Sequence, residues 1–174
     1  MSEAGEFQII EQFFTYPSFG AWKSQGVGDD CAIIDTGAGR LAVTCDMTAL
    51  GTHFFPDADP EDVGYKALAV NLSDLAAAGA VPRAFFLSIG LPRRDDGWLA
   101  DFSRGLMALA HESGCALLGG DTTRTPEIDG RHAPATISIT AMGDLPAGMG
   151  LTRSGAQPGD DIWVSGTVGD AYAA

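Results

Sequence analysis

A long apolar run at residues 63–80 constrains the fold of this 174-residue chain more than any other stretch. Alanine, leucine and valine dominate it, and from Ala67 onward its one charged residue is Asp74. Such a run predicts a helix that is buried on most sides and ends near Gly79. A carboxylate in that setting is costly unless it is paired, and no Lys or Arg lies one turn away. Asp74 therefore has a partner from elsewhere in the chain, binds a metal ion, or faces solvent at the last turn.

Composition narrows the class of protein. The hydrophobic content of 45% is enough for one domain with a real core, and the net charge of −13 argues against a nucleic-acid surface. No apolar run reaches the length that spans a bilayer, and the first residues lack the basic and apolar parts of a signal peptide. We expect a cytoplasmic protein with no membrane or nucleic-acid partner. Its three cysteines then read as small core residues in a reducing compartment: Cys31, Cys45 and Cys115.

Strand and helix patterns alternate along the chain, with short connections between strands. Asp59 is a suitable helix N-cap before Pro60, and the second strand pattern ends at Asp46. The aromatic residues near the N-terminus are expected in the core. These patterns favour an α+β fold over a doubly wound parallel sheet. Strands are expected at residues 31–34, 41–45, 84–91, 115–118, 135–143 and 160–166, helices at 6–14, 59–79 and 95–113, and a polar loop at 125–133.

Four acidic residues share one kind of setting, beside small residues or at the end of an element. Separate carboxylates are the ligands that Mg²⁺ prefers, and neighbouring glycines let phosphate approach backbone N–H groups. Together they predict a metal–nucleotide site, although Asp30 and Asp121, taken singly, are better explained as ordinary turn residues. A Walker A motif is absent from the sequence, so an ATP site here would not be a P-loop. The four are Asp30, Asp46, Asp74 and Asp121.

Two basic or neutral side chains are candidates for ligand contacts. Arg153 is one of ten Lys and Arg residues and could hold a phosphate, or else form a surface ion pair. His53 could contact a substrate, or be a half-buried structural residue. Cys31 follows two acids that would raise the pKa of its thiol, so it is not expected to be a nucleophile.

Several motifs, in order along nearly the whole chain, closely resemble the thiamine-monophosphate kinase family. They occupy residues 26–32, 44–46, 53–54, 65–80, 119–124 and 151–156, and include Asn71-Leu72-Ser73-Asp74 and Gly119-Gly120-Asp121-Thr122-Thr123. The resemblance implies the N-terminal domain of the aminoimidazole ribonucleotide synthetase-like fold, a mixed or antiparallel sheet with flanking helices that pairs across a homodimer. Residues 1–145 would form the ATP-binding, magnesium-binding and dimerisation domain, and residues 146–174 a linker and the start of a truncated second domain.

The resemblance also implies an activity and a set of site residues. Mg²⁺ ions would support direct transfer of the γ-phosphoryl group of ATP to thiamine monophosphate, giving thiamine diphosphate, without a covalent intermediate on the protein. Asp74 matches the acid that bridges several ions, and His53 matches a substrate contact. The matching metal positions are Asp30, Thr44, Cys45, Asp46, Asp74 and Asp121, and the matching ATP positions are Asp30, Thr44, Gly120, Asp121 and Arg153.

The chain departs from the family pattern in three ways, the first of which is a longer and more Pro-rich stretch at residues 124–150. Cys45 stands where a hydroxyl residue is usual, so a side-chain oxygen ligand would be lost there while a backbone carbonyl would survive. The family's second half is absent, so we expect the 174 residues alone to bind Mg-ATP weakly and not to turn over. Alternatives are another ATP-using superfamily member, such as an aminoimidazole ribonucleotide or selenophosphate synthetase, or a non-catalytic dimerisation or nucleotide-binding domain.

Overall fold

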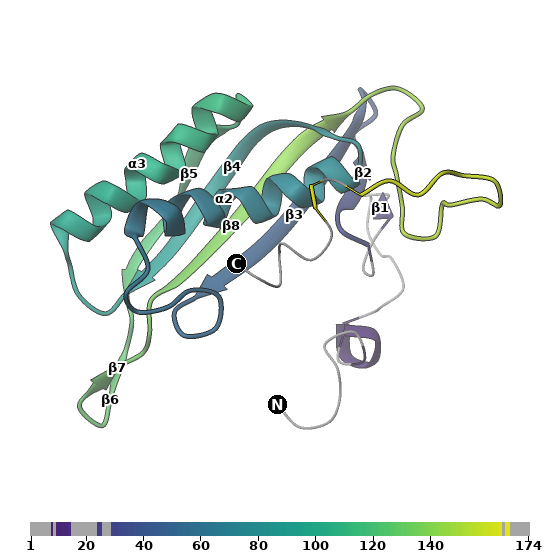
Figure 1. The fold of residues 1–174 in the computed structure, drawn as a ribbon. Coiled ribbons are helices and arrows are strands. Elements are labelled where there is room, and N and C mark those ends of the chain that lie inside the picture. Colours follow the sequence, from purple (N-terminus) through teal and green to yellow (C-terminus); the bar gives the residue numbers. More distant parts are fainter. Residues whose placement is uncertain (1–7, 9, 15–23, 26–28, 165, 168–174) are drawn as a thin grey trace.

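Two long helices lie side by side on one face of a six-stranded sheet (Figure 1). The computed structural model describes residues 8, 10–14, 24–25, 29–164 and 166–167. Across the sheet the strand order is β1-β2-β3-β8-β4-β5. In chain order the elements are η1 (Ile10–Phe14), β1 (Ser24–Gln25), β2 (Ala32–Asp35), β3 (Arg40–Ala49), α2 (Pro60–Ala77), β4 (Val81–Leu91), α3 (Asp96–Ser113), β5 (Ala116–Arg124), β6 (Glu127–Ile128), β7 (Arg131–His132) and β8 (Thr136–Leu145).

The sheet is mixed, which confirms the predicted α+β class. β3 pairs antiparallel with β2 and β8, and β8 pairs antiparallel with β4. β4 pairs parallel with the edge strand β5, because α3 connects the two strands as a crossover. The protein's largest fully buried side chains come from this sheet and α2, and they include Phe85, Leu68, Leu75, Ile137 and Ile139.

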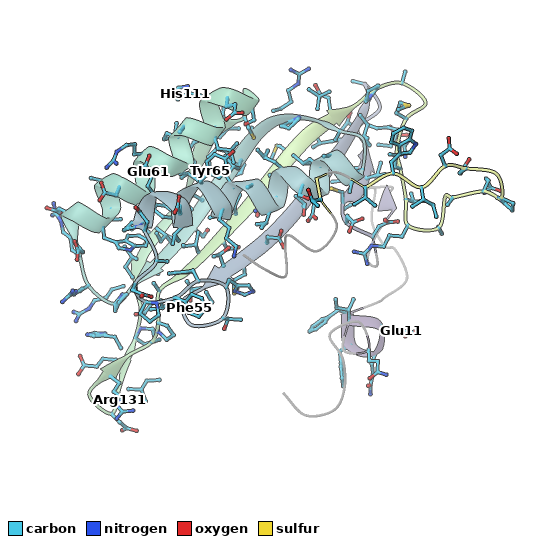
Figure 2. The ribbon with its side chains drawn as sticks, in the orientation of Figure 1. Glu11, Phe55, Glu61, Tyr65, His111 and Arg131 are labelled. Carbon is cyan, nitrogen blue, oxygen red and sulfur yellow. The ribbon has the colours of Figure 1, made fainter. Side chains whose placement is uncertain are left out.

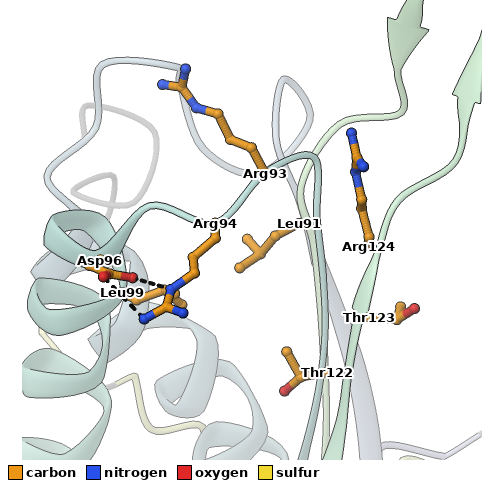
Figure 3. A pocket seen from close by; sticks show the side chains of 8 residues that line it. All are labelled: Leu91, Arg93, Arg94, Asp96, Leu99, Thr122, Thr123 and Arg124. Carbon is orange, nitrogen blue, oxygen red and sulfur yellow. Dashed lines mark hydrogen bonds and ion pairs between the residues drawn. The ribbon is translucent and has the colours of Figure 1, made fainter.

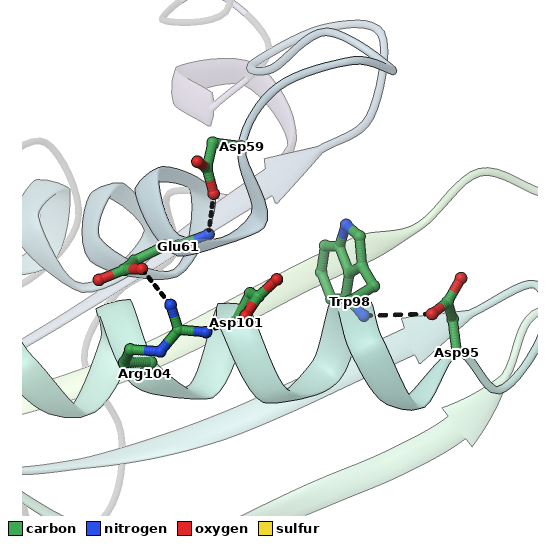
Figure 4. Close-up of polar contacts among 6 residues, drawn as sticks. All are labelled: Asp59, Glu61, Asp95, Trp98, Asp101 and Arg104. Atoms are coloured by element: carbon green, nitrogen blue, oxygen red, sulfur yellow. Dashed lines mark hydrogen bonds and ion pairs between the residues drawn. The ribbon is translucent and has the colours of Figure 1, made fainter.

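The predicted helix ends are confirmed. Asp59 accepts a hydrogen bond from the N–H of Glu61 at 2.9 Å, and Asp95 accepts one from the N–H of Trp98 at 3.1 Å (Figure 4). Beyond α2, Gly79 has a φ of +75°, and α3 ends at Gly114 with a φ of +66°. Both glycines take the left-handed conformation that commonly terminates helices.

The two helices approach so closely that two glycines are required between them. A Cβ at Gly64 would lie 2.0 Å from the carbonyl oxygen of Phe102, and a Cβ at Gly105 would lie 1.9 Å from that of Glu61. Arg104 of α3 bridges this contact, with its guanidinium 2.5 Å from Glu61 and also paired with Asp101 (Figure 4). α2 is thereby held against α3 on this face of the sheet (Figure 1).

α2 is buried on most sides and exposed on one. Tyr65 is exposed on its outer side, while Val63, Ala67 and Leu68 are buried. Figure 2 shows Tyr65 on this helix, Phe55 in the loop before it and Arg131 at the hairpin remote from the sheet. The expectation of burial on most sides is confirmed, and the exposed positions lie on the one outer side that α3 and the sheet leave uncovered.

Several predicted boundaries are also wrong. β3 continues past Asp46 to Ala49, and residues 119–124 extend β5 instead of forming a turn, because pairing with β8 and β4 continues beyond the apolar runs. Residues 127–132 contain a small β6–β7 hairpin where a loop was expected.

Two expectations for the ends of the chain are wrong as well. Residues 160–164 form no strand, and Ile162 and Trp163 are exposed. Of the expected N-terminal helix, the described part is the five-residue π-helix η1, whose Phe13 and Phe14 are exposed because it lies apart from the sheet (Figure 1). Within the described residues, no helix is both long and apolar enough to cross a membrane.

Candidate functional site

Four acidic side chains converge around the thiol of Cys31, where β2 begins and α2 ends. Cys31 is buried, and its Sγ donates to the carbonyl oxygen of Asp74 at 3.3 Å. Burial first, and then the charges of nearby carboxylates, raise the pKa of this thiol to about 12. The prediction that Cys31 is no nucleophile is therefore supported. The carboxylates, in order of decreasing effect, are Asp74, Asp30, Asp29 and Asp46, which we call the acid cluster.

Asp74 has a partner from a distant part of the chain. Its Oδ2 accepts a hydrogen bond of 2.7 Å from the hydroxyl of Thr44, which lies on β3 and is only 6% exposed. Asp74 itself is half-buried in the last turn of α2. Of the alternatives left open by the sequence, full exposure to solvent is excluded. The hydroxyl also fixes the direction of the carboxylate, as a metal ligand requires.

Asn71 joins α2 to β3, a role that was not predicted from the sequence. Its side chain is fully buried, its Oδ1 accepts the N–H of Asp46 at 3.2 Å, and its Nδ2 donates to the carbonyl of Ala67. β2 pairs with β3 only as far as Val43, so Asp46 has no β2 neighbour to bond its N–H. The sequence did offer a signal for this role, because Asn71 is an amide residue inside an apolar helix, three residues before Asp74.

Arg153 contacts the acid cluster directly. Its Nη2 lies 2.5 Å and its Nε 3.2 Å from the same oxygen of Asp30, while its backbone N–H donates to Asp29 at 3.0 Å. The hydrogen bond to Asp30 and the charges of Asp30, Asp29 and Asp74 raise the pKa of Arg153 above its ordinary value. Of the two sequence hypotheses for this residue, the ion pair is observed.

Cys45 points away from the acid cluster. Neighbouring residues of a strand face opposite sides of a sheet, so Thr44 lies under α2 and Cys45 is on the open face. There its Sγ accepts a hydrogen bond from the hydroxyl of Thr140 at 3.3 Å and lies 3.6 Å from Ser138 Oγ. The structure thus separates the thiol of Cys45 from the side chains of Thr44 and Asp74.

Asp121 and Gly120 lie on β5, at the other edge of the sheet. The register joins Asp121 to Ser88 and Ser138 on the open face, whereas Asp46 is on the helix-covered face. Since β8 and β4 intervene between β3 and β5, the strands carrying Asp46 and Asp121 are about 14 Å apart. One copy of this chain does not bring Asp121 into the acid cluster.

Gly120 also has a structural reason to be glycine. Its φ is +152°, and a Cβ would lie 1.7 Å from the carbonyl oxygen of Leu87. A register irregularity between Phe85 and Phe86 accompanies this close approach of β5 to β4.

His53 lines a cavity of about 340 Å³ beside the N-terminal half of α2. Its Nδ1 accepts the N–H of Ala49 at 3.0 Å, and Lys66 Nζ donates to its carbonyl at 2.9 Å. The backbone and one ring nitrogen are therefore fixed, and Asp62 and Lys66 also line the cavity.

A larger cavity of about 690 Å³ lies where the parallel strands β4 and β5 end (Figure 3). Three arginines line it, Arg93, Arg94 and Arg124, although the chain as a whole is acidic. Arg94 is held by Asp96 at 2.5 and 3.1 Å (Figure 3). Arg124 Nη2 lies 2.9 Å from His132 Nε2. This group was not predicted from the sequence, although adjacent arginines after an apolar strand were a signal.

The donor chemistry at the acid cluster fits Mg²⁺. Among the described residues, no three His, Cys, Asp or Glu side chains are grouped closely enough to hold a metal by themselves. Mg²⁺ at phosphoryl-transfer sites uses one or two carboxylates, with water and substrate phosphates as its other ligands. Asp74, fixed by Thr44, and Asp30, held by a cation, are suitable carboxylates.

Comparisons with known proteins agree with the motifs. Thiamine-monophosphate kinase of Salmonella typhimurium is 44% identical over 171 residues, which cover 97% of this chain and 50% of that protein. The crystal structure of thiamine-monophosphate kinase from Stenotrophomonas maltophilia K279a has a TM-score of 0.70 at 47% identity, covering 84% of this chain and 44% of that one. The structure of AaThiL complexed with AMPPCP and TMP has a TM-score of 0.69 at 28% identity, covering 77% and 41%.

The likeness to thiamine-monophosphate kinases that the motifs predicted is thus confirmed, and the chain spans about half the length of the curated relatives it matches. Residues 28–145 match the family described as AIR synthase related protein, N-terminal domain. The chain therefore belongs to the AIR synthase related proteins and carries their N-terminal domain.

Proposed function

We propose that this chain supplies the ATP-binding and magnesium-binding part of a cytoplasmic enzyme that phosphorylates thiamine monophosphate to thiamine diphosphate. The observation that carries the proposal is the acid cluster, in which Asp74 is oriented by Thr44 and three further carboxylates act electrostatically on the same thiol. Relatives over 97% of the chain are named thiamine-monophosphate kinases, and a structural neighbour was solved with AMPPCP and TMP, which supports ATP and thiamine monophosphate as ligands.

Each residue has a defined part in the proposed reaction. Asp30, Asp46 and Asp74 hold Mg²⁺, and Thr44 keeps the Asp74 carboxylate in one direction. Bound Mg²⁺ supplies charge neutralisation and alignment of the two phosphate groups for in-line displacement. His53 and Lys66 line the cavity proposed for the acceptor. The acceptor is a phosphate that is already ionised, so the reaction needs no strong general base from the protein.

We further propose that the functional unit is a homodimer. The edge strand β5 is exposed along its whole length, and apolar side chains beside it, Phe86, Leu117 and Leu118, are exposed as well. Because Asp121 is remote from the acid cluster of its own chain, a second copy is the proposed route by which Gly120 and Asp121 join a nucleotide site. An exposed strand edge is a ready template for such pairing.

The test is the substitution Asp74→Asn, with Mg-ATP affinity measured by isothermal titration calorimetry at limiting Mg²⁺. Changing even an outer-shell partner of a metal ligand costs about 10- to 100-fold in affinity, so we expect at least about a tenfold loss with an unchanged circular dichroism spectrum. Asp144→Asn is the matched control, since Asp144 is an exposed acid paired with Arg83. Unchanged ATP affinity in Asp74→Asn would show that the helix acid is structural.

Turnover is measured in the complete polypeptide that contains these residues, because the relatives are about twice as long. Thiamine diphosphate formation from ATP and thiamine monophosphate is expected, and Asp74→Asn should abolish it. Turnover with an aminoimidazole precursor or selenide in place of thiamine monophosphate would contradict the proposed acceptor. For the 174-residue chain alone we predict Mg-ATP binding without turnover.

A further inference from the structure

Residues 149–155, which we call the strap, are tied across the end of α2 and the start of β2. Arg40 Nη1 donates to the carbonyl oxygen of Met149 at 2.8 Å, and the N–H of Leu151 donates to that of Ala78 at 3.0 Å. The N–H of Arg153 then donates to Asp29 Oδ1 at 3.0 Å. Three long-range hydrogen bonds therefore hold the strap beside the acid cluster.

The guanidinium of Arg153 concentrates its contacts on a single carboxylate oxygen. Both Nη2 and Nε bond Asp30 Oδ1, and the Asp30 side chain is only 28% exposed. A guanidinium is permanently charged, so it offsets the repulsion among the four carboxylates. A divalent ion that binds Asp30 would provide the same compensation at the same place. The guanidinium of Arg153 and a divalent ion would therefore compete for the carboxylate of Asp30.

We infer that Arg153 is an internal cation for the acid cluster, and that a divalent metal ion binding at Asp30 displaces its guanidinium and loosens the strap. The inference rests on the proposed function, because it takes Asp30 as a metal ligand. It adds a competition that makes the position of the strap depend on the metal.

The first test measures Mg²⁺ affinity without nucleotide, by isothermal titration calorimetry at constant ionic strength. Removing the competing cation in Arg153→Gln should tighten Mg²⁺ binding by about two- to fivefold, the range expected for a partly exposed ion pair. Arg104→Gln removes the same charge at the far end of α2, where Arg104 pairs with Glu61 and Asp101, and should leave the affinity unchanged. Equal or weaker binding in Arg153→Gln would overturn the inference.

Asp30→Asn separates this inference from the proposed function. If Asp30→Asn loses Mg²⁺ binding while Arg153→Gln matches the wild type, the metal site stands and the competition is wrong. If neither the wild type nor Arg153→Gln binds Mg²⁺, both the metal site and the competition are wrong. Thermal unfolding monitored by circular dichroism confirms that each variant is folded before titration.

The second test uses trypsin, which cleaves after Arg153, and reads the position of the strap without any activity assay. Cleavage between Arg153 and Ser154 should accelerate at least about threefold when Mg²⁺ is saturating. Cleavage after the exposed Arg131, at the β6–β7 hairpin (Figure 2), provides an internal reference that should not change. In Asp30→Asn, cleavage after Arg153 should be fast and independent of Mg²⁺. A wild-type rate that does not respond to Mg²⁺ would refute the displacement of Arg153.

Discussion

The two edges of the sheet hold candidate site residues by different means. At the β2–β3 edge, side chains are fixed by contacts between distant parts of the chain: Thr44 bonds Asp74, and Arg153 bonds Asp30. At the β5 edge every residue is exposed, and the close contact of Gly120 is with the backbone of β4. The difference indicates that the acid cluster is preorganised within one chain, whereas Asp121 is positioned by strand β5 but remains exposed. Substitutions at the two edges should therefore differ in their structural cost.

Asn71→Leu should give the largest loss of stability, because it removes the amide that joins α2 to β3. The N–H of Asp46 would lose its partner in a partly buried setting, and an unsatisfied buried group costs about 1–3 kcal/mol. We expect a decrease of about 2 to 3 kcal/mol in the free energy of unfolding, measured by urea denaturation. The matched change at the other edge, Asp121→Asn, should alter it by less than about 0.5 kcal/mol. Similar losses for the two variants would remove the distinction between the edges.

Gly120→Ala tests whether every position of the exposed strand β5 tolerates substitution. A methyl group there would meet the carbonyl oxygen of Leu87, at a φ of +152° that side chains rarely adopt, so we expect a loss of about 2 kcal/mol. Gly119→Ala is the control, because its Cβ would lie at an ordinary 3.7 Å from the Phe86 ring. If both alanine variants unfold at the same urea concentration, the backbone contact of Gly120 does not constrain β5.

The sequence predicts which helices and strands form better than it predicts where the strands end. Helix ends followed from local chemistry at Asp59, Asp95 and Gly114, whose capping depends on neighbours a few residues away. Strand ends did not, because β3 and β5 continue through Asp46 and Asp121 by pairing with strands that are distant in the sequence. Apolar runs report where a strand is buried, but pairing decides where it ends.

In the candidate site too, local features could be predicted from the sequence and long-range contacts could not. The residue types of the acid cluster were identifiable from the sequence, and the period of two along a strand places Thr44 and Asp46 on one face with Cys45 on the other. The partners were not identifiable, since Asp30 and Arg153 are separated by 123 positions. The separation of Asp121 from the acid cluster depends on the strand order, which spacing does not determine.

Thr44→Val should have the smallest of these effects, and it tests the contact that orients Asp74. Valine keeps the shape of threonine but removes the hydroxyl that donates to Asp74 Oδ2 at 2.7 Å. Water can partly replace this donor because Asp74 is only half-buried, so we expect a loss of about 1 kcal/mol in the free energy of unfolding. Thr140→Val is the control on the open face, where the hydroxyl donates to the weakly accepting sulfur of Cys45, and its effect should be near zero. If Thr140→Val costs as much as Thr44→Val, the hydrogen bond to Asp74 contributes nothing specific, and the carboxylate is oriented by the packing of α2 alone.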